Sequence, residues 1–481
     1  MNRKIVVKVL GAMLALEGIA LLFPALVALP DRDGSAKSFL LTAGLCFLLG
    51  LPAAYLNTEG LRMQRRDGFA AAGLCWILLG AAGALPYVFS GSVESYTDAL
   101  FETISGFTTT GATIFSDIEA LPRSVLFWRA ETNWLGGMGV LVLLLALLPR
   151  LSDGSANLMR AESPGPVMTK LLPRIADTAK VLYLIYIGLT AAEILVLCLL
   201  GMPLYDSVTN AFATIATGGF CIHSASIGFY ESAAITWTVT VFMFLSGINF
   251  SVLYLLLLRR FREAFASEEL RCYALIALTA SAFVAVDLVA QMQCGAAIAF
   301  RDAVFQVVSY MTTTGFTTDT AALWPESSQC VLLLVMLFGG CAGSTAGGIK
   351  HIRALVLWKD MRRWLQHILH PREVHPVCVD GKRVEEETTN HIACFFFGYM
   401  LLLVLGTFVI SLDKVPFLDA FTAALTSISN VGPAFGALGI AGHFASLSAV
   451  SKLTMSVCML FGRLEIVPLL ILLMPSLWRK A

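Results

Sequence analysis

The chain has 481 residues, of which 57% are hydrophobic and only 14% are charged, and its mean hydropathy is +0.77. Its formal net charge is zero, because 33 basic residues balance 33 acidic ones. No soluble globular domain of this size has such a composition, so a soluble protein is excluded. We expect an all-α polytopic membrane protein that is surrounded by the lipid bilayer and has no nucleic-acid partner.

Apolar stretches recur along the chain, and each is long enough to cross the hydrocarbon layer as a helix of about twenty residues. The first covers residues 5–29 and is not a removable secretory signal, because it is too long and a second stretch follows directly. We predict ten spans, near residues 5–29, 38–56, 68–90, 125–149, 179–202, 233–258, 272–294, 329–357, 389–412 and 449–475.

The basic residues indicate the direction of these crossings, because Lys and Arg are retained on the cytoplasmic side of short loops. The membrane topology that places most of the basic residues on one side has both termini in the cytoplasm. The loops on the opposite side keep only Arg32, Lys37, Arg123, Arg301 and Lys414. An even number of crossings agrees with this arrangement.

Four polar segments between spans share one pattern, in which an aspartate precedes a glycine. Residues 98–113 and 302–317 match at the aspartate, at Thr-Thr-Thr-Gly and at the following threonine. The other two segments keep the frame more loosely, with Asp206 before Gly218 and Asp419 before Gly432. The aspartate precedes the glycine by thirteen residues in the first, third and fourth segments and by twelve in the second.

Each unit is therefore interpreted as a helix, a short half-helix, a glycine-containing extended segment and a second helix, and four units can surround one axis. We predict that Asp98, Asp206, Asp302 and Asp419 cap the half-helices rather than bind an ion. Backbone that is not helical is tolerated at membrane depth only where protein or a water-filled cavity satisfies it. Glycine lets carbonyl oxygens turn toward the axis, where they can replace the hydration shell of a cation.

The predicted cation-binding residues come three from each segment. They are Thr109, Thr110 and Gly111; Ala216, Thr217 and Gly218; Thr313, Thr314 and Gly315; and Asn430, Val431 and Gly432.

The same pattern predicts the organisation of the chain. We expect an N-terminal two-helix hairpin over 1–66, four pore repeats over 67–150, 151–262, 263–358 and 389–481, and a cytoplasmic linker over 359–388. Within the linker, an Asp380-Gly381 turn between alternating segments predicts a β-hairpin.

The eighth span is interrupted by small and polar residues that cannot form a continuous apolar helix in lipid. We predict that they form a loop beneath the pore segments; they are Gly339, Gly340, Gly343, Ser344, Thr345, Gly347, Gly348 and Lys350. Arg463 lies in the last span, where a charge is costly unless it faces a cavity or a partner, so we assign it to the same site.

These segments resemble the Trk, Ktr and HKT superfamily of cation transporters. The resemblance rests on Thr109-Thr110-Gly111-Ala112-Thr113, Ala216-Thr217-Gly218-Gly219-Phe220, Trp128-Arg129, Trp134-Leu-Gly-Gly-Met-Gly139 and Ser246-Gly-Ile-Asn-Phe250. The TrkH branch is favoured by the two extra N-terminal helices and by four motifs at residues 160–165, 339–350, 370–374 and 462–465.

The resemblance implies a potassium-translocating subunit of a bacterial Trk-type uptake system, located in the inner membrane. It also implies a homodimer with one pore in each subunit, regulated by a cytoplasmic ring of TrkA-type nucleotide-binding subunits. In this family the 339–350 loop, with Arg463, would obstruct permeation until the ring moves it. Potassium would be the transported substrate, with no bound cofactor, and glycine at all four positions favours potassium over sodium.

Two other classes of function are considered. A sodium- or proton-coupled cation symporter usually carries buried acidic residues near its site, and the middles of these spans hold only Glu17, Glu193 and Glu465. An enzyme within the membrane would need a convergent nucleophile and base, or paired metal ligands. The spans contain no such constellation, so we predict no enzymatic activity and no catalytic residues.

Overall fold

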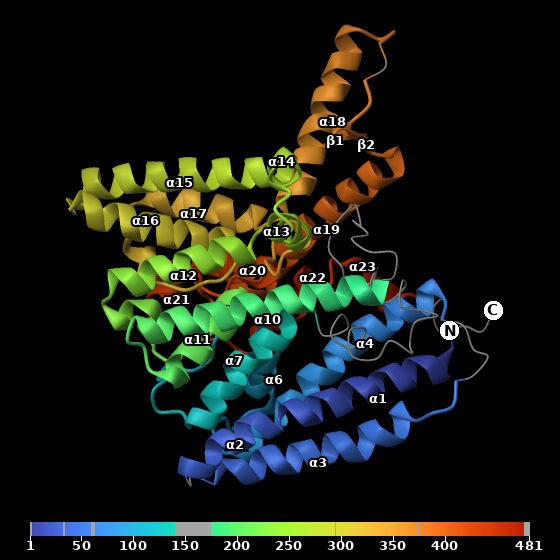
Figure 1. The fold of residues 1–481 in the computed structure, drawn as a ribbon, viewed down its shortest axis with the longest axis vertical. Coiled ribbons are helices and arrows are strands. Elements are labelled where there is room, and N and C mark those ends of the chain that lie inside the picture. The colour runs from blue at the N-terminus through green and yellow to red at the C-terminus, as the bar shows by residue number, and fades with distance from the viewer. Residues whose placement is uncertain are drawn as a thin grey trace.

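The computed structural model describes residues 2–31, 34–58, 63–139, 175–293, 295–373 and 375–475. Residues 140–149 of the predicted fourth span and the motif at 160–165 lie outside these ranges. Where the chain is described it is mostly helical, which confirms the all-α prediction (Figure 1).

The N-terminal part is a hairpin of α1 (Arg3–Ala20), α2 (Leu22–Asp31) and α3 (Ser35–Ala54). Its two long helices approach closely through glycines, since a Cβ added to Gly50 would lie 2.8 Å from the carbonyl oxygen of Gly11. Small residues allow such backbone contact between membrane helices. Helix α1 also packs against α4 (Arg65–Gly83), which joins the hairpin to the rest of the bundle.

The remaining chain contains four units, each with a largely buried helix at its centre. The first unit contains α4, α5 (Leu85–Phe89), α6 (Tyr96–Phe107) and α7 (Arg123–Gly137). The second contains α10 (Ile175–Leu199), α11 (Leu204–Ile215), η2 (Ser226–Tyr230), α12 (Ala233–Ser246) and α13 (Phe250–Leu257). The third contains α14 (Phe261–Ala266), α15 (Glu268–Met292), α16 (Ala296–Met311), η3 (Ala321–Leu323), α17 (Glu326–Phe338) and α18 (His351–Leu369). The fourth contains α19 (Glu386–Ser411), α20 (Phe417–Ser429), α21 (Gly436–Ala441), α22 (Ala449–Arg463) and α23 (Val467–Leu473).

Six helical stretches in the described ranges are long and apolar enough to cross a membrane. The predicted span over 233–258 is not one straight helix, because α12 and α13 meet at an angle of 105°. Two interactions explain the bend. The side chain of Asn249 caps α13 by accepting a hydrogen bond from the Ser251 amide at 2.8 Å, and the Phe250 amide donates to the carbonyl of Gly343 in the 339–350 loop.

The last predicted span, over 449–475, is also broken. Helix α22 ends at Arg463, and Glu465 and Ile466 have φ angles of 59° and 68° before α23 begins. Positive φ is rare for a β-branched residue, so this break is a strained feature of the backbone. The eighth span is interrupted between α17 and α18, as the sequence predicted.

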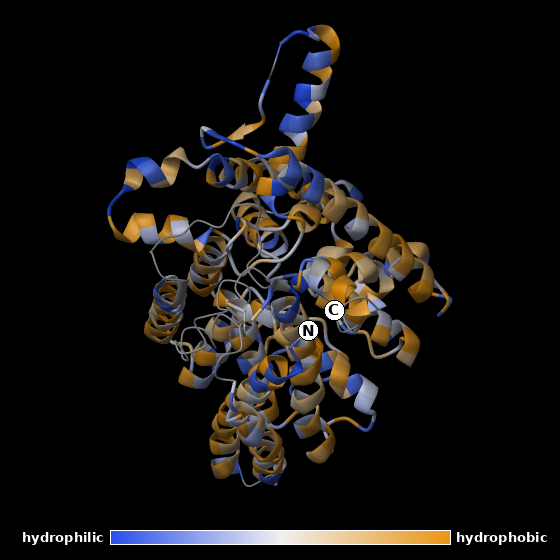
Figure 2. Cartoon of the chain, turned by 90° about the vertical axis from the view of Figure 1, so that its right-hand side faces the viewer, coloured by the Kyte–Doolittle hydropathy of each residue, from blue (hydrophilic) through white to orange (hydrophobic). Residues whose placement is uncertain are grey.

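The first turn of α1, the start of α4 and helix α23 lie at the same end of the bundle (Figure 1). The Asn2 amide donates to the Asp67 carboxylate at 2.8 Å, and Gly73 contacts Leu472. Hydrophobic residues dominate the bundle, whereas the projecting segment that contains α18 and the short strands is rich in hydrophilic ones (Figure 2).

The short strands form the hairpin that the sequence predicted in the linker. Strand β1 (Cys378–Val379) pairs antiparallel with β2 (Lys382–Arg383). Asp380 and Gly381 between them both have positive φ, at 50° and 73°, as a type I′ turn requires.

Candidate functional site

The four short helices α6, α11, α16 and α20, here called the pore helices, end in the same way. Soon after each helix comes a non-glycine residue in the left-handed region, and a glycine with positive φ follows two residues later. The first set is Thr109, Thr217, Thr313 and Asn430, with φ of 55°, 54°, 56° and 57°; the second is Gly111, Gly219, Gly315 and Gly432, with φ of 77°, 70°, 80° and 105°. Left-handed backbone is uncommon outside glycine, so its recurrence at matched positions identifies a structural repeat.

Hydrogen bonds show the same correspondence. In each repeat, or quarter of the ring, the middle residue lies between the left-handed residue and the glycine. Its amide donates to the carbonyl oxygen of the residue five positions earlier, which closes the end of the pore helix. The donors are Thr110, Gly218, Thr314 and Val431, the acceptors are Ser105, Ala213, Ser309 and Thr426, and the distances are 2.8, 2.8, 2.9 and 3.0 Å.

These angles and bonds correct the second predicted segment by one residue. Gly219, rather than Gly218, is the counterpart of Gly111, while Gly218 matches Thr110. The segment is therefore Thr217, Gly218 and Gly219, and Ala216 precedes it. The sequence contained the signal, because counting from Asp206 to Gly219 gives the same thirteen residues as in the other three repeats.

The four segments, 109–111, 217–219, 313–315 and 430–432, here called the pore segments, meet in a closed ring. In every quarter a Cβ added to the glycine would lie against the carbonyl oxygen of the middle residue of the next quarter. The separations are 2.3 Å from Gly111 to Gly218, 2.0 Å from Gly219 to Thr314, 2.0 Å from Gly315 to Val431 and 2.6 Å from Gly432 to Thr110. The glycines are therefore gathered around one axis, and no larger residue fits without moving a neighbouring carbonyl.

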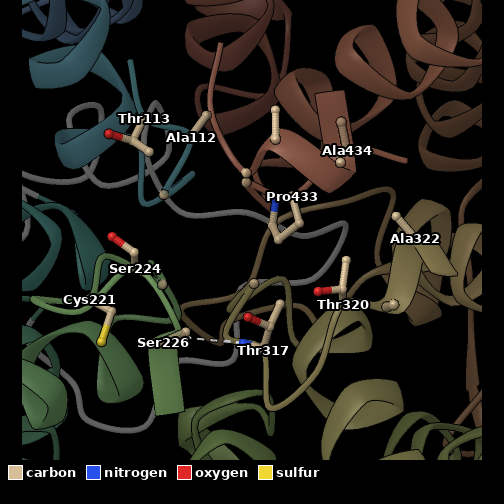
Figure 3. Close-up of a pocket in the computed structure, with 18 of the residues that line it drawn as sticks. Ala112, Thr113, Cys221, Ser224, Ser226, Thr317, Thr320, Ala322, Pro433 and Ala434 are labelled. Carbon is tan, nitrogen blue, oxygen red and sulfur yellow. Dashed lines mark hydrogen bonds between the residues drawn. The ribbon is translucent and has the colours of Figure 1, made fainter. Parts of the chain in front are cut away.

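A cavity of about 220 Å³, here called the vestibule, lies on one side of this ring. All four matched glycines line it, whereas Gly218 does not. Figure 3 shows that its wall comes from all four repeats, including Thr113 of the first, Cys221 of the second, Thr317 of the third and Pro433 of the fourth.

Charged side chains of both signs line the vestibule or lie near it, and Arg129 is one of the lining residues. Asp319 lines it, and His223 lies 3.7 Å from both Glu119 and Asp206. Burial alone would raise the pKa of Glu119, but the Ser224 hydroxyl and amide donate to its carboxylate at 2.5 and 2.9 Å, and the pKa is lowered overall. This carboxylate is therefore ionised at neutral pH and attracts cations.

The predicted capping role of the four aspartates is wrong. The capping residues of the pore helices are Ser95, Pro203, Gly295 and Pro416, so the helices begin earlier than expected. Asp98, Asp206 and Asp419 lie in the first turn, where an acidic residue still suits the helix dipole, and Asp302 lies further inside α16. The side chains of Asp98, Asp206 and Asp419 bind other elements, as in the 2.8 Å ion pair between Asp98 and Lys452 of α22, whereas Asp302 pairs with the adjacent Arg301.

The 339–350 loop lies against the pore segments, on the side of the pore-helix ends. The Thr345 hydroxyl is close to the carbonyls of Ile215 and Ser246, at 3.1 and 3.2 Å. The Gly347 amide donates to the Thr313 hydroxyl at 2.6 Å. A Cβ on Gly347 would lie 2.2 Å from the Ser429 carbonyl, so the loop contacts three of the four quarters directly.

Within the loop, backbone conformation depends on several of the predicted residues. Gly339, Gly343 and Gly348 have φ near +70°, and Lys350 has φ of 77° although it is not glycine. The Lys350 ammonium donates to the carbonyl of Ala346, and Ser344 donates to Cys341. Gly340 accepts a hydrogen bond from the His351 amide, which joins the loop to α18.

Arg463 connects the loop to the first repeat. Its guanidinium donates to the Thr345 carbonyl at 2.7 Å and to the carbonyls of Gly136 and Gly137 at the end of α7. The structure thus brings this residue to the loop, as predicted.

Glu269, at the start of α15, was not predicted. Its carboxylate accepts hydrogen bonds from the amides of Ala342 and Ile352, at 2.7 and 3.3 Å. It therefore holds both ends of the loop. No local pattern could have indicated this, since the partners are far away in the sequence.

The membrane-spanning helices and the closed ring of four pore segments define a polytopic membrane protein of the pore-loop class. Comparison with known proteins agrees. The chain belongs to the TrkH family of cation transport proteins, whose model matches residues 36–480, and the resemblance found in the sequence is confirmed.

Relatives match over the whole length. The Trk system potassium uptake protein TrkH of Salmonella typhimurium is 38% identical over 485 residues, which cover 100% of both chains. The potassium uptake protein TrkG of Escherichia coli K12 is 35% identical and covers 99% of both chains. The crystal structure of the potassium transporter TrkH from Vibrio parahaemolyticus is similar at a TM-score of 0.88 and 35% identity, with 100% of both chains covered.

Proposed function

We propose that this chain is the potassium-translocating subunit of a bacterial Trk-type potassium uptake system. The observation that carries the proposal is the closed ring of pore segments, in which each glycine abuts a carbonyl oxygen of the next quarter. Such a ring can replace the hydration shell of a monovalent cation with backbone carbonyls, as potassium filters do. The names of the full-length relatives support potassium as the substrate. The protein is then a transporter rather than an enzyme.

The 339–350 loop is the gate in this proposal, together with Arg463. It stands directly behind the ring and is held there by hydrogen bonds to Ile215, Thr313 and Arg463. These few bonds form a small set that a conformational change can break. We further propose that a homodimer with one pore per subunit sits in the inner membrane with both termini cytoplasmic, and that a cytoplasmic TrkA-type nucleotide-binding ring moves the gate.

The hairpin of β1 and β2 is the proposed contact for the regulatory TrkA-type ring. It projects from the bundle and is fastened to α15, where the Glu268 amide donates to Asp380 at 2.7 Å and the Asp380 amide donates to Glu268 at 3.1 Å. The neighbouring Glu269 holds the gate through the Ala342 amide. A force on the hairpin would therefore reach the gate through two adjacent residues.

Uptake of radioactive rubidium into proteoliposomes tests the proposal, with sodium and lithium as competitors. We expect rubidium uptake that potassium inhibits and that sodium and lithium inhibit much less. Absence of rubidium uptake, with and without the regulatory ring, or equal inhibition by all three ions, would refute a potassium-selective pore.

A sodium- or proton-coupled cation symporter is the second candidate. Glu17 favours it, because this carboxylate is buried within the helical bundle and neither of its oxygens has a hydrogen-bond partner in the described chain. Protonatable groups of this kind are typical of coupled transporters. Rubidium uptake driven against its own gradient by an imposed pH or sodium gradient would support the symporter, whereas strictly downhill flux would support the channel-like pore.

A further inference from the structure

In three of the four repeats, a polar side chain on the pore helix sits nine residues before the matched glycine. These residues are Glu102, Asn210 and Gln306; the fourth counterpart is Ala423, and its neighbour Thr422 is polar instead. Each polar side chain bonds to the chain just after the glycine. The Cys221 thiol donates to Asn210 at 3.5 Å, Gln306 donates to the Phe316 carbonyl at 3.4 Å, and the Phe435 amide donates to Thr422 at 3.1 Å.

Glu102 is the only charged member of this set. Its carboxylate accepts hydrogen bonds from the Thr113 hydroxyl and the Ile114 amide, both at 3.0 Å. It also accepts from Nε of Arg129 on α7 at 2.8 Å. The two charged side chains are 0% and 1% exposed, so the pair is fully buried.

Arg129 reaches from the first repeat into the second. One of its terminal nitrogens donates to the Cys221 carbonyl at 3.1 Å, and the other donates to the Thr113 hydroxyl at 3.2 Å. The guanidinium also lies 4.2 Å from the ring centre of Phe220. One side chain therefore joins the chain that follows Gly111 to the chain that follows Gly219. Figure 3 shows Thr113 and Cys221 on the same side of the vestibule.

Charge makes this contact important for a cation. Arg129 forms part of the vestibule wall, and the adjoining ring is the proposed cation site. A buried guanidinium whose counter-ion is removed remains charged, because arginine does not lose its proton in proteins. Its field would then oppose a cation in the ring, whereas the paired carboxylate cancels most of that field.

We propose that Glu102 and Arg129 form a neutral brace, which fixes the first two pore segments relative to each other and sets the cation affinity and selectivity of the ring. Both act as positioning residues, since neither is placed in contact with the ion. The inference rests on the proposed function, because it requires that a cation passes through the ring.

Uptake of rubidium into proteoliposomes of the full chain tests the brace. The two readouts are the rubidium concentration at half-maximal uptake, here called the half-saturating concentration, and the ratio of rubidium uptake to sodium uptake, here called the rubidium-to-sodium ratio. E102Q leaves Arg129 without its counter-ion, so we expect the half-saturating concentration to rise by about tenfold, the order expected for one uncompensated charge several ångströms away. In E102Q/R129Q both charges are gone, and we expect the half-saturating rubidium concentration to be closer to the wild-type value than it is in E102Q alone. This rescue separates the charge effect from simple loss of packing.

The matched control is the ion pair of Asp98 and Lys452. Asp98 is on the same pore helix as Glu102, but neither it nor Lys452 lines the vestibule. We expect D98N and K452Q to leave the half-saturating concentration unchanged. An equal rise in these controls would overturn the brace, and so would wild-type values in E102Q or a double variant worse than E102Q.

If E102Q does not fold, E102D decides the matter, since it keeps the charge but shortens the reach to Arg129. A reduced rubidium-to-sodium ratio with a near wild-type half-saturating concentration supports the brace, and wild-type values for both overturn it. A wild-type chain that takes up no rubidium at all would refute the proposed function instead.

Discussion

The amide of Gly347 donates a hydrogen bond of 2.6 Å to the side-chain hydroxyl of Thr313. Thr313 is the left-handed residue of the third pore segment, and Gly347 belongs to the loop between α17 and α18. The proposed filter and the proposed gate are therefore in direct contact. A change in the loop must alter the hydrogen bonding of the ring, and a change in the ring must alter the loop.

Gly111→Ser and Gly219→Ser should each reduce the discrimination of potassium from sodium by roughly tenfold or more, a change equivalent to about 1.4 kcal/mol. The added Cβ would lie 2.3 Å from the Gly218 carbonyl in the first case and 2.0 Å from the Thr314 carbonyl in the second. Either carbonyl must move away from its place in the ring. Competition of sodium with rubidium uptake in proteoliposomes measures the effect.

Gly201→Ser is the control for backbone strain. Gly201 has φ of 91°, but a Cβ there would meet nothing within 4 Å. We expect unchanged selectivity in this variant, and only a small loss of stability from placing serine at a positive φ. Unchanged selectivity in Gly219→Ser would contradict the corrected alignment of the second segment.

Thr345→Val should raise basal flux by about fivefold, because two carbonyl contacts of the gate are lost and a net hydrogen bond contributes about 1 kcal/mol. Valine keeps the shape of threonine but cannot donate to Ile215 or Ser246. The measurement is rubidium uptake without the regulatory ring.

Thr407→Val provides the comparison for that experiment. Thr407 is also buried, but its hydroxyl donates only within its own helix, to the carbonyl of Leu403 at 2.8 Å. Basal flux should stay at the wild-type level in this variant. If Thr345→Val behaves in the same way, the loop is not held closed by its threonine.

The sequence predicted the pore segments because the repeat is carried by local residues, namely an aspartate and a glycine at constant spacing. The capping prediction for Asp98 failed because Ser95 begins the helix one turn earlier. A proline does so before Asp206 and Asp419, and Gly295 begins α16 seven residues before Asp302. Proline suits that place because its φ is fixed and its nitrogen needs no partner.

Other features depend on contacts between distant residues, which no local pattern reveals. The bend between α12 and α13 is fastened by the bond from Phe250 to Gly343. Likewise, Glu269 bonds to Ala342 in the loop. Hydropathy alone describes α12 and α13 as one apolar stretch, so the bend could not be predicted from it.

Arg463→Ala should raise basal flux and weaken its dependence on the regulatory ring. The substitution removes the bonds from the guanidinium to Thr345 in the gate and to Gly136 and Gly137 in α7. Arg463→Lys should give an intermediate result, since lysine keeps the charge but cannot donate in a fork. Rubidium uptake with and without the regulatory ring is measured for both variants. Wild-type uptake by Arg463→Ala in both conditions would make this residue purely structural.

Asp380→Ala should loosen the hairpin and reduce the effect of the regulatory ring on transport. The variant loses the acceptor for the Glu268 amide and places alanine at a φ of 50°, which asparagine and aspartate tolerate better. We expect amide hydrogen exchange in β1 and β2 to become about tenfold faster, from the loss of roughly 1 to 1.5 kcal/mol. Asp380→Asn keeps an acceptor and tolerates the turn, so its exchange should stay near wild type. Equal amide exchange in the two variants would contradict the role of Asp380 in fastening the hairpin to α15. Full regulation of transport in Asp380→Ala would show that the hairpin does not control the gate.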